Sequence, residues 1–389
     1  MAIIVHDLNN TFPSKSGFHE QYIRELLYKA DIQVNGSRPW DMYINHKSVY
    51  KQLFQRGSLG LGETYMEGLW DCQKPDEMLF RILRADLQSL VQKDPLSILY
   101  GIKSKIINLQ TQTGAYVVAR NHYDISNELY SAMLDSRMIY SCAYWKNAKD
   151  LDSAQENKLD LICRKLKLEP GQSLLDIGCG WGGLAQFAAE RYDVNVVGIT
   201  IAKQQALLAK AKCEGLPVEI RLEDYRNLNG KFDKIVSVGM FEHVGYKNYA
   251  EFMQIVRRTL KHDGLFLLHT IGGNQSVTRI DPWINKYIFP NAMIPSLTQI
   301  GKATEKVLIT EDVQNLGPHY DPTLMAWLQR FQQAWPMLKG KGIYNEDFYR
   351  MWVYYLSCCA ATFRAKENNV WQMVMSLPAS LKTYESIRE

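Results

Sequence analysis

The stretch LLDIGCGWGG at residues 174–183 decides how this chain folds. An apolar run leads into a cluster of glycines, which predicts a buried strand followed by a tight turn. Glycine lets the backbone turn sharply and approach a ligand with no Cβ in the way. The residues from the turn to Arg191 predict a helix, whose first N–H groups are free to face that ligand. We therefore predict a strand, a glycine turn and a helix that together bind a small molecule.

Outward from this stretch, short runs rich in Val, Ile and Leu alternate with helical runs. The predicted strands span residues 173–178, 194–200, 218–223, 234–240, 265–271 and 370–377. Such runs are typical of parallel strands that are covered by helices on both faces. The predicted fold class is α/β, with a doubly wound and mostly parallel sheet. Two further helices are expected at 323–335 and 346–366.

Length and charge divide the chain and exclude several classes of protein. The 389 residues are enough for two or three domains. The sequence pattern predicts a small N-terminal α+β domain at 1–88, a helical linker at 89–120 and an α/β domain at 121–389. The net charge of +4 is dispersed, so it does not predict a nucleic-acid partner. No run of 18 apolar residues predicts a membrane span, and the first ten residues do not predict a secretory signal.

Cysteine usage favours a reducing compartment. The seven cysteines include no CxxC pair and no Cys/His spacing that is typical of a metal site. We therefore expect no metal centre and a cytoplasmic location.

The charges near the glycine turn limit the class of ligand that it could bind. Gly178, Gly180 and Gly183 satisfy the dinucleotide pattern G-x-G-x-x-G, which is a weak signal on its own. Asp176 would repel a pyrophosphate but suits a cationic ligand. No acid for a ribose follows about twenty residues later, as a nicotinamide site would have. These features favour S-adenosylmethionine, whose amino and sulfonium groups are positive; a turn with only a packing role remains open.

Several polar stretches fall at the ends of the predicted strands. In an open α/β sheet, ligands bind beyond the carboxyl ends of the strands. The residues at such ends are 176–180, Thr200 and Ile201, Glu223 and Asp224, Glu242, and His269. The sequence therefore predicts that they converge on one edge of the sheet.

Longer motifs identify a family. The chain resembles the cyclopropane fatty acid synthases, S-adenosylmethionine-dependent enzymes that methylenate cis double bonds of membrane phospholipids. The motifs are GSLGLGETYMEGL at 57–69, YSCAYW at 140–145, SVGMFEHVG at 237–245, LLHTIG at 267–272 and DPWINKYIFP at 281–290. The resemblance implies a seven-stranded sheet of the methyltransferase type.

By this resemblance, ten residues surround S-adenosylmethionine. They are Tyr140, Ser141, Asp176, Gly178 and Gly180 near the methionine part, Thr200, Ile201 and Gln205 near the ribose, and Glu223 and Asp224 near the adenine. The second strand ends in Thr200, where many methyltransferases have an acid for the ribose. Thr200 and Gln205 could therefore also be an ordinary strand end and helix surface.

The resemblance implies a second group of residues around a bicarbonate ion. These residues are Cys142, Glu242, His269, Ile271 and Tyr320. We expect His269 and Tyr320 to donate hydrogen bonds to bicarbonate and Glu242 to accept its hydroxyl proton. Cys142 and the Ile271 backbone would complete the cage. The simpler alternatives are an inert buried Cys142, a structural His269 and a Glu242 that caps a helix.

The substrate and partners are also implied by the family. An apolar, aromatic stretch at 281–295 falls in a region, about 272–325, where we expect an insertion that lines a lipid site or touches a bilayer surface; packing as ordinary core is the alternative. The resemblance implies unsaturated phospholipid acyl chains as substrate, peripheral contact with the inner face of the membrane, and a homodimer. Alternative functions are a methyltransferase that forms a methyl branch or methylates a small molecule, a non-catalytic lipid-binding module, and a nicotinamide oxidoreductase.

Overall fold

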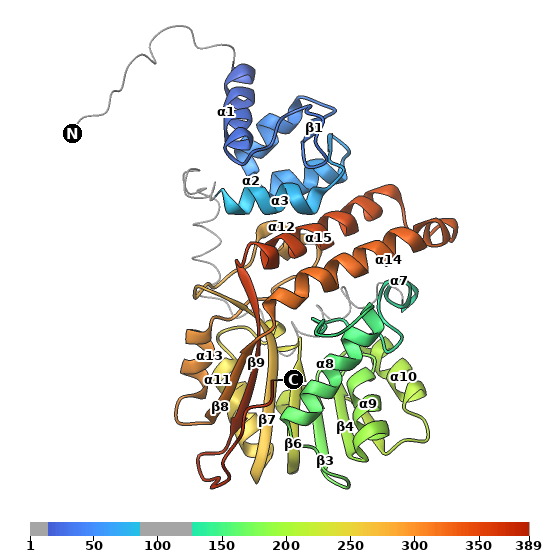
Figure 1. Ribbon diagram of the computed structural model, residues 1–389, viewed down its shortest axis with the longest axis vertical. Coiled ribbons are helices and arrows are strands. Elements are labelled where there is room, and N and C mark those ends of the chain that lie inside the picture. The colour runs from blue at the N-terminus through green and yellow to red at the C-terminus, as the bar shows by residue number, and fades with distance from the viewer. Residues whose placement is uncertain (1–14, 86–126, 389) are drawn as a thin grey trace, which may run out of the picture.

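The computed structural model describes residues 15–85 and 127–388. Within these residues one seven-stranded sheet has the order β5-β4-β3-β6-β7-β9-β8 (Figure 1). Its first five strands are parallel, and β9 is antiparallel to both of its neighbours. The strands are β3 (Ser173–Ile177), β4 (Asn195–Thr200), β5 (Val218–Leu222), β6 (Phe232–Val238), β7 (Leu260–Gly273), β8 (Ile309–Asn315) and β9 (Asn368–Ser376). This confirms the predicted fold class.

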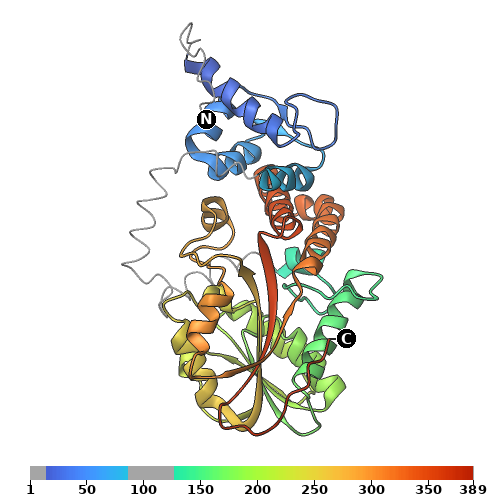
Figure 2. The ribbon, with the colours of Figure 1, turned by 60° about the vertical axis from the view of Figure 1, so that its left-hand side comes forward.

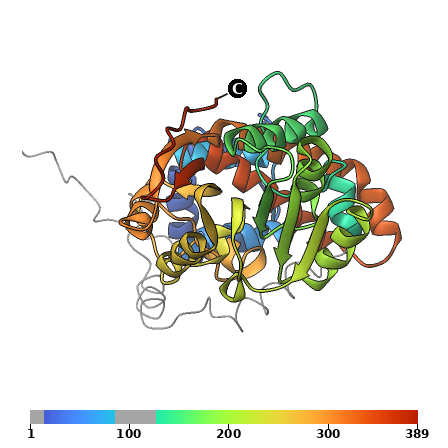
Figure 3. The same cartoon turned by 90° about the horizontal axis from the view of Figure 1, so that it is seen from below.

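Helices cover both faces of the sheet, as the view along the strands shows (Figure 3). Alternate residues of β3 explain why: Leu174 packs into the core beneath α8 (Leu151–Lys165) and α9 (Gly183–Tyr192), whereas Leu175 packs beneath α11 (Tyr249–Thr259) and α13 (Leu297–Thr304). Both leucines are fully buried. Other short elements of this part of the chain are α7 (Asn127–Met133), α10 (Lys203–Lys212), and the 3-10 turns η1 (Tyr225–Asn227), η2 (Phe241–His243) and η3 (Gly317–His319).

Two long helices, α14 (Tyr320–Gly340) and α15 (Glu346–Arg364), lie between the sheet and the N-terminal part of the chain (Figures 1 and 2). Asn345 caps α15 by accepting a hydrogen bond from the Phe348 N–H at 3.0 Å. Their apolar side chains share one buried cluster with N-terminal residues such as Trp70 and Met78. The two parts of the molecule therefore meet through a common core.

The N-terminal part, as far as the structure describes it, contains three helices and two short strands. It consists of α1 (Lys15–Lys29), β1 (Tyr43–Ile44), α2 (Ser48–Met66), β2 (Trp70–Asp71) and α3 (Pro75–Arg84). The two short strands pair antiparallel. The glycine-rich motif lies in α2, where Gly57 has a φ of 52° and kinks the helix.

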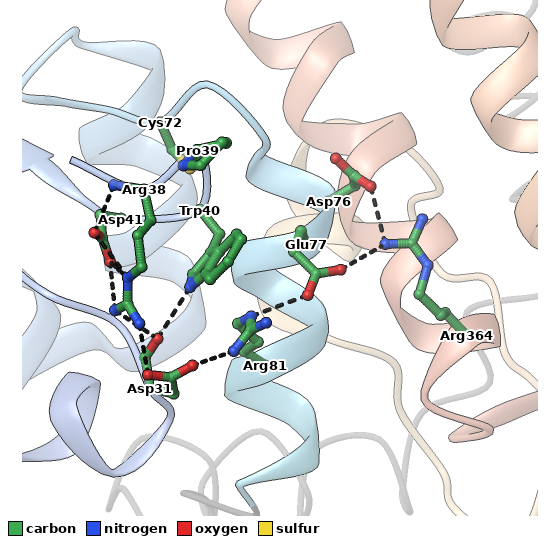
Figure 4. A network of polar contacts seen from close by, with 10 residues as sticks. All are labelled: Asp31, Arg38, Pro39, Trp40, Asp41, Cys72, Asp76, Glu77, Arg81 and Arg364. Atoms are coloured by element: carbon green, nitrogen blue, oxygen red, sulfur yellow. Dashed lines mark hydrogen bonds and ion pairs between the residues drawn. The ribbon is translucent and has the colours of Figure 1, made fainter. Parts of the chain in front are cut away.

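Charged groups join the N-terminal unit to the long helices (Figure 4). Arg364 at the end of α15 contacts Asp76 of α3 at 2.9 Å and Glu77 at 3.4 Å. The same guanidinium makes two further 2.9 Å bonds to Asp321, in the first turn of α14. Arg364 thus connects three helices beside Tyr320.

The structure changes some boundaries. The predicted helix 323–335 extends over Tyr320–Gly340, so Tyr320 begins it. Residues Ile309–Asn315, assigned to an insertion at 272–325, are instead β8 at the edge of the sheet; the inserted part contains the short α12 (Pro282–Tyr287). The expected linker at 89–120, and with it the boundary at 88, lies outside the described residues. In the part of the chain that the structure describes, no helix is long and apolar enough to span a membrane.

Candidate active site

A cavity lies at the carboxyl ends of β3, β4 and β6. Its lining includes all ten residues predicted to surround S-adenosylmethionine: Tyr140, Ser141, Asp176, Gly178, Gly180, Thr200, Ile201, Gln205, Glu223 and Asp224. They come from four separate stretches of the chain, at 140–141, 176–180, 200–205 and 223–224. The strand order brings them to one edge, as the rule for open α/β sheets predicts.

The glycine turn forms one wall of this cavity. Gly178 and Gly180 have φ values of 85° and 54°, a region that residues with a Cβ rarely adopt. A Cβ on Gly178 would also collide with the side chain of Met240. The N–H groups of Gly178 and Cys179 donate to the Ile199 carbonyl at 3.0 and 2.9 Å, which ties the turn to β4. The backbone conformation that the sequence predicted is therefore present.

Asp176 supplies a buried carboxylate to the cavity. The residue is only 2% exposed, and its Oδ2 has no hydrogen-bond partner. Burial raises the pKa of this carboxyl to about 7, and the nearby charge of Lys158 opposes that rise. An orphaned carboxylate oxygen in a cavity suits a ligand that brings a positive donor.

Lys158 is a cavity residue that the sequence analysis missed. It lies on α8, is completely buried, and donates from Nζ to the Ser141 Oγ at 2.9 Å. Burial lowers the pKa of its ammonium group to about 8. In the sequence, Lys158 lies among apolar helix positions such as Ala154, Leu161 and Ile162, but a lysine on a helix surface would show the same local pattern. A lysine is almost never fully buried unless its charge is paired.

The other end of the cavity is built from β4 and β5. Gln205 is buried and accepts a hydrogen bond from the Thr200 hydroxyl at 3.0 Å, so neither residue is an ordinary surface position. Asp224 accepts from the Arg226 N–H at 3.0 Å and pairs with the Arg226 guanidinium at 2.9 Å. Its carboxylate is thus held by its own turn, while Glu223 precedes it on the cavity wall.

Glu242 is the centre of the second group of predicted residues. Its Oε1 accepts the Ile271 N–H at 2.6 Å, and its buried Oε2 has no partner. Burial raises the pKa of this carboxyl to about 7, and the Ile271 N–H opposes the rise. Glu242 lies in η2 and does not cap a helix with its side chain.

Cys142 and Ile271 are joined through the backbone of β9. The Cys142 thiol donates to the Leu316 carbonyl at 3.6 Å, and the Leu316 N–H donates to the Val370 carbonyl at 2.7 Å. Val370 is the cross-strand partner of Ile271. Burial raises the pKa of the Cys142 thiol, so the sulfur is not a thiolate.

Tyr320 and His269 reach this region from different elements. The Tyr320 ring packs on Phe363 and Trp327, with ring centroids 4.5 and 5.9 Å apart. Trp327 also packs on Tyr140 of the cavity, at 5.2 Å. His269 is 2% exposed on β7, two residues before Ile271, and burial holds its pKa well below the usual range. Its imidazole is therefore neutral.

The two groups are distinct. Among the described residues that line the cavity none of Cys142, Glu242, His269, Ile271 and Tyr320 occurs, whereas His243, next to Glu242, does line it. Ser141 and Cys142 are adjacent in sequence, and the Gly239 N–H donates to the His269 carbonyl at 2.9 Å. Cys142, Glu242 and His269 therefore lie behind the cavity wall, each next to a residue that lines it. No cluster of three His, Cys, Asp or Glu side chains suited to a metal occurs in the ranges 15–85 and 127–388.

Comparisons with known proteins agree with this geometry. The family model described as mycolic acid cyclopropane synthetase matches residues 110–373. The cyclopropane-fatty-acyl-phospholipid synthase of Escherichia coli strain K12 is 51% identical over 355 residues, which cover 90% of this chain and 92% of that protein.

Solved structures give the same result. The cyclopropane synthase MmaA2 of Mycobacterium tuberculosis is 32% identical and aligns with a TM-score of 0.62 over 67% of this chain and 97% of its own. The mycolic acid cyclopropane synthase CmaA1, solved in complex with SAH and CTAB, is 34% identical, with a TM-score of 0.61 and the same coverage. On this evidence the chain belongs to the S-adenosylmethionine-dependent cyclopropane synthase family.

Proposed function

We propose that this protein transfers a methylene group from S-adenosylmethionine to cis double bonds of phospholipid acyl chains and forms cyclopropane fatty acyl lipids. The observation that carries the proposal is the pair of buried carboxylates, Asp176 and Glu242, each with one oxygen that lacks a hydrogen-bond partner. One lines the cavity and the other lies behind its wall. Each oxygen matches a donor that the reaction would bring.

The first match is between Asp176 and the methionine part of S-adenosylmethionine. The orphaned Oδ2 of Asp176 accepts a hydrogen bond from the ammonium group of the ligand. The Ser141 hydroxyl already accepts from Lys158, so its own proton is available to the carboxylate of the ligand. Gly178 and Gly180 let the backbone approach the ligand closely. The remaining predicted residues around the cavity then contact the ribose and the adenine.

The chemistry follows from the weakness of an alkene as a nucleophile. The π electrons of the double bond form a bond to the sulfonium methyl carbon, and the carbon–sulfur electrons leave with sulfur as a neutral thioether. The positive charge moves to the other former alkene carbon. Loss of a proton from the new methyl group then frees the electron pair that closes the three-membered ring.

The residues behind the cavity wall fit a bicarbonate ion. Glu242 Oε2 is a buried acceptor without a donor, and a bicarbonate hydroxyl would supply one. His269, the Tyr320 hydroxyl and the Cys142 thiol would hold the remaining oxygens. When bound, bicarbonate would supply a base that takes the proton from the new methyl group, while the hydrogen bonds that hold it would keep it from being alkylated itself. Tyr320, packed among Trp327 and Phe363, presents an aromatic face, which attracts a cation.

The inserted segment provides a route for the acyl chain. Pro290 and Asn291 line the cavity, and the Phe289 ring packs on Tyr355 with centroids 5.8 Å apart. The Tyr355 hydroxyl in turn hydrogen-bonds the Tyr140 hydroxyl at 2.6 Å. Trp283, Ile288 and Met293 of this segment are buried, so these side chains pack as core and only the rest of the segment is available for contact with lipid. We place this segment against the cytoplasmic face of the membrane, as part of a homodimeric enzyme.

Phospholipid vesicles test the proposal. The enzyme is incubated with vesicles of unsaturated phosphatidylethanolamine and methyl-labelled S-adenosylmethionine, and the fatty esters are analysed by mass and NMR. Gain of one CH2, with ring protons and no alkene protons at the modified position, is the expected result. A labelled chain that keeps its alkene indicates a branch-forming methyltransferase. Label in small molecules with unmodified lipid contradicts a lipid substrate.

A further inference from the structure

Two buried polar residues, Gln372 and Lys165, form a chain of hydrogen bonds that leads to His269. Gln372 lies on β9 directly across from His269 on β7, and its Nε2 is 3.2 Å from the His269 Nδ1. The Gln372 Oε1 accepts a hydrogen bond from the Lys165 Nζ at 2.8 Å. Gln372 and Lys165 are both completely buried. Neither was among the residues singled out by sequence.

This chain of contacts determines where the imidazole carries its proton. An ammonium group can only donate, so Lys165 must face the oxygen of the Gln372 amide. The amide nitrogen then faces His269 and donates to Nδ1, which must be unprotonated to accept. A neutral imidazole carries one proton, so that proton lies on Nε2. The ring can therefore donate in the direction away from Gln372.

The charges around His269 keep the ring neutral. Lys158 and Lys165, both from α8, lower its pKa further below the value that burial gives. The other charged groups nearby are Asp312 of β8, whose Oδ2 is 4.0 Å from the Lys165 Nζ, and Arg388 of the C-terminal segment, which pairs with Asp312. Burial lowers the pKa of Lys165 to about 8, and the charge of Asp312 opposes that fall. Below pH 8 the ammonium form therefore predominates and donates to Gln372.

We propose that Gln372, oriented by Lys165, is a positioning residue that holds His269 as the neutral Nε2–H tautomer, ready to donate a hydrogen bond to the anion proposed for this site. The inference rests on the proposed function of His269. It explains why α8 has a buried lysine and β9 a buried amide at positions where apolar side chains could also pack. Hydrogen bonding at one ring nitrogen commonly fixes the tautomer of a functional histidine.

The tautomer can be read without measuring activity. Protein labelled with 15N-histidine is examined by NMR, and His269→Asn identifies the His269 signals by their loss. We expect the Nε2–H pattern in the wild type across the neutral pH range. In Gln372→Glu a carboxylate faces Nδ1 and accepts a hydrogen bond from an Nδ1–H group, so the Nδ1–H tautomer or the imidazolium is expected. A wild-type Nδ1–H pattern overturns the proposal.

Turnover supplies the second readout. Gln372→Leu removes the donor to Nδ1, and we expect kcat to fall at least tenfold at every pH. Gln372→Glu raises the pKa of His269, so the imidazolium, with its Nε2–H restored, is populated below that pKa. Its kcat is therefore expected to rise as pH falls, a limb that the wild type lacks. Gln332→Leu, at an exposed position of α14, is the control and should keep wild-type turnover.

A double-mutant cycle separates this inference from the function on which it rests. If His269→Asn keeps wild-type turnover, the role proposed for His269 is wrong. If His269→Asn is inactive while both Gln372 variants keep the wild-type kcat and pH profile, His269 is functional and the positioning role is wrong. Gln372→Leu is also made in the His269→Asn enzyme. If it lowers kcat there by the same factor as in the wild type, Gln372 does not act through His269, which also contradicts the proposal. Thermal melting confirms that each variant is folded.

Discussion

Asp176 and Glu242 are buried to a similar extent, and each carboxyl has a pKa of about 7 and one orphaned oxygen. Their surroundings differ. Asp176 lines the cavity near the charge of Lys158, whereas Glu242 lies behind the wall and is held by a neutral N–H of Ile271. The same side-chain chemistry is thus prepared for two tasks. An acceptor in an open cavity can bind a ligand, and one in a closed pocket can take part in a proton transfer.

The largest effect is expected where the carboxylate is enclosed. Glu242→Gln keeps the shape but replaces an acceptor oxygen with an NH2 donor, so it cannot accept the hydroxyl proton of the proposed anion. We expect kcat to fall by about 10²–10⁴, with affinity for S-adenosylhomocysteine within about twofold of wild type. Steady-state kinetics and calorimetry measure the two quantities.

The control for Glu242→Gln is Glu214→Gln. Glu214 is an exposed residue that follows α10, so this change should leave both quantities at wild-type values. A Glu242→Gln enzyme that loses ligand affinity as much as turnover would mean that the two carboxylates share one task and that the comparison is wrong.

Asp176 should give the opposite pattern. Asp176→Asn removes the charge that meets the ligand's ammonium group, and a hydrogen bond to a charged group contributes about 1.5–3 kcal/mol. We expect affinity for S-adenosylhomocysteine to fall roughly ten- to a hundredfold. Affinity for methylthioadenosine, which lacks the amino-acid part, should not change. Equal losses for both ligands would place Asp176 elsewhere in the cavity.

How much of this could be predicted from sequence depends on how local the signal is. The glycine turn and the strand ends are local features, so six of the seven strands were predicted from sequence, and the ten residues expected around S-adenosylmethionine line one cavity. β8 was missed because its sequence, ITEDVQN, is mostly polar, as suits an edge strand with little apolar cover. The roles of the cavity residues remain predictions.

The contacts behind His269 could not be predicted for a different reason. Gln372 was predicted to lie on a strand. Its contact with His269 arises because β9 inserts between β7 and β8, and no local sequence pattern predicts that strand order. Lys158 and Lys165 stand seven residues apart on one face of α8, and a helix surface would explain two lysines equally well. Only their burial shows that the charges act inside the protein.

The pKa of Asp176 predicts how ligand affinity depends on pH. The ionised carboxyl binds the ammonium group, and a pKa of about 7 in the free protein means that this form is lost as pH falls below 7. Affinity for S-adenosylhomocysteine should be nearly constant above about pH 8 and weaken by about tenfold between pH 8 and pH 6. Calorimetry at several pH values measures this, and Asp176→Asn should give a flat profile. A flat wild-type profile would contradict the assignment.

The same shifts affect stability in the ligand-free protein. A carboxyl whose pKa is raised by folding binds its proton more tightly in the native state than in the unfolded chain. Stability therefore falls as pH rises from about 4, the unfolded pKa, to about 7. Asp176→Asn and Glu242→Gln should flatten this dependence, so that at pH 8 the melting temperature of each variant exceeds that of wild type by a few degrees. A lower melting temperature at pH 8 would mean that both charges are compensated in the native state.

The smallest effect is expected for the weakest hydrogen-bonding group behind the cavity wall. A thiol is a poor donor, and burial keeps Cys142 protonated, so it contributes neither a nucleophile nor a strong bond. We expect Cys142→Ala to lower kcat by less than about tenfold, well short of the Glu242→Gln loss, with unchanged affinity for S-adenosylhomocysteine. Native Cys142 should also resist a thiol reagent at pH 8, as followed by peptide mass mapping. Rapid labelling of Cys142, or a loss of turnover as large as that of Glu242→Gln, would show that the sulfur takes part in the chemistry and that the residues behind the cavity wall act by more than hydrogen bonding.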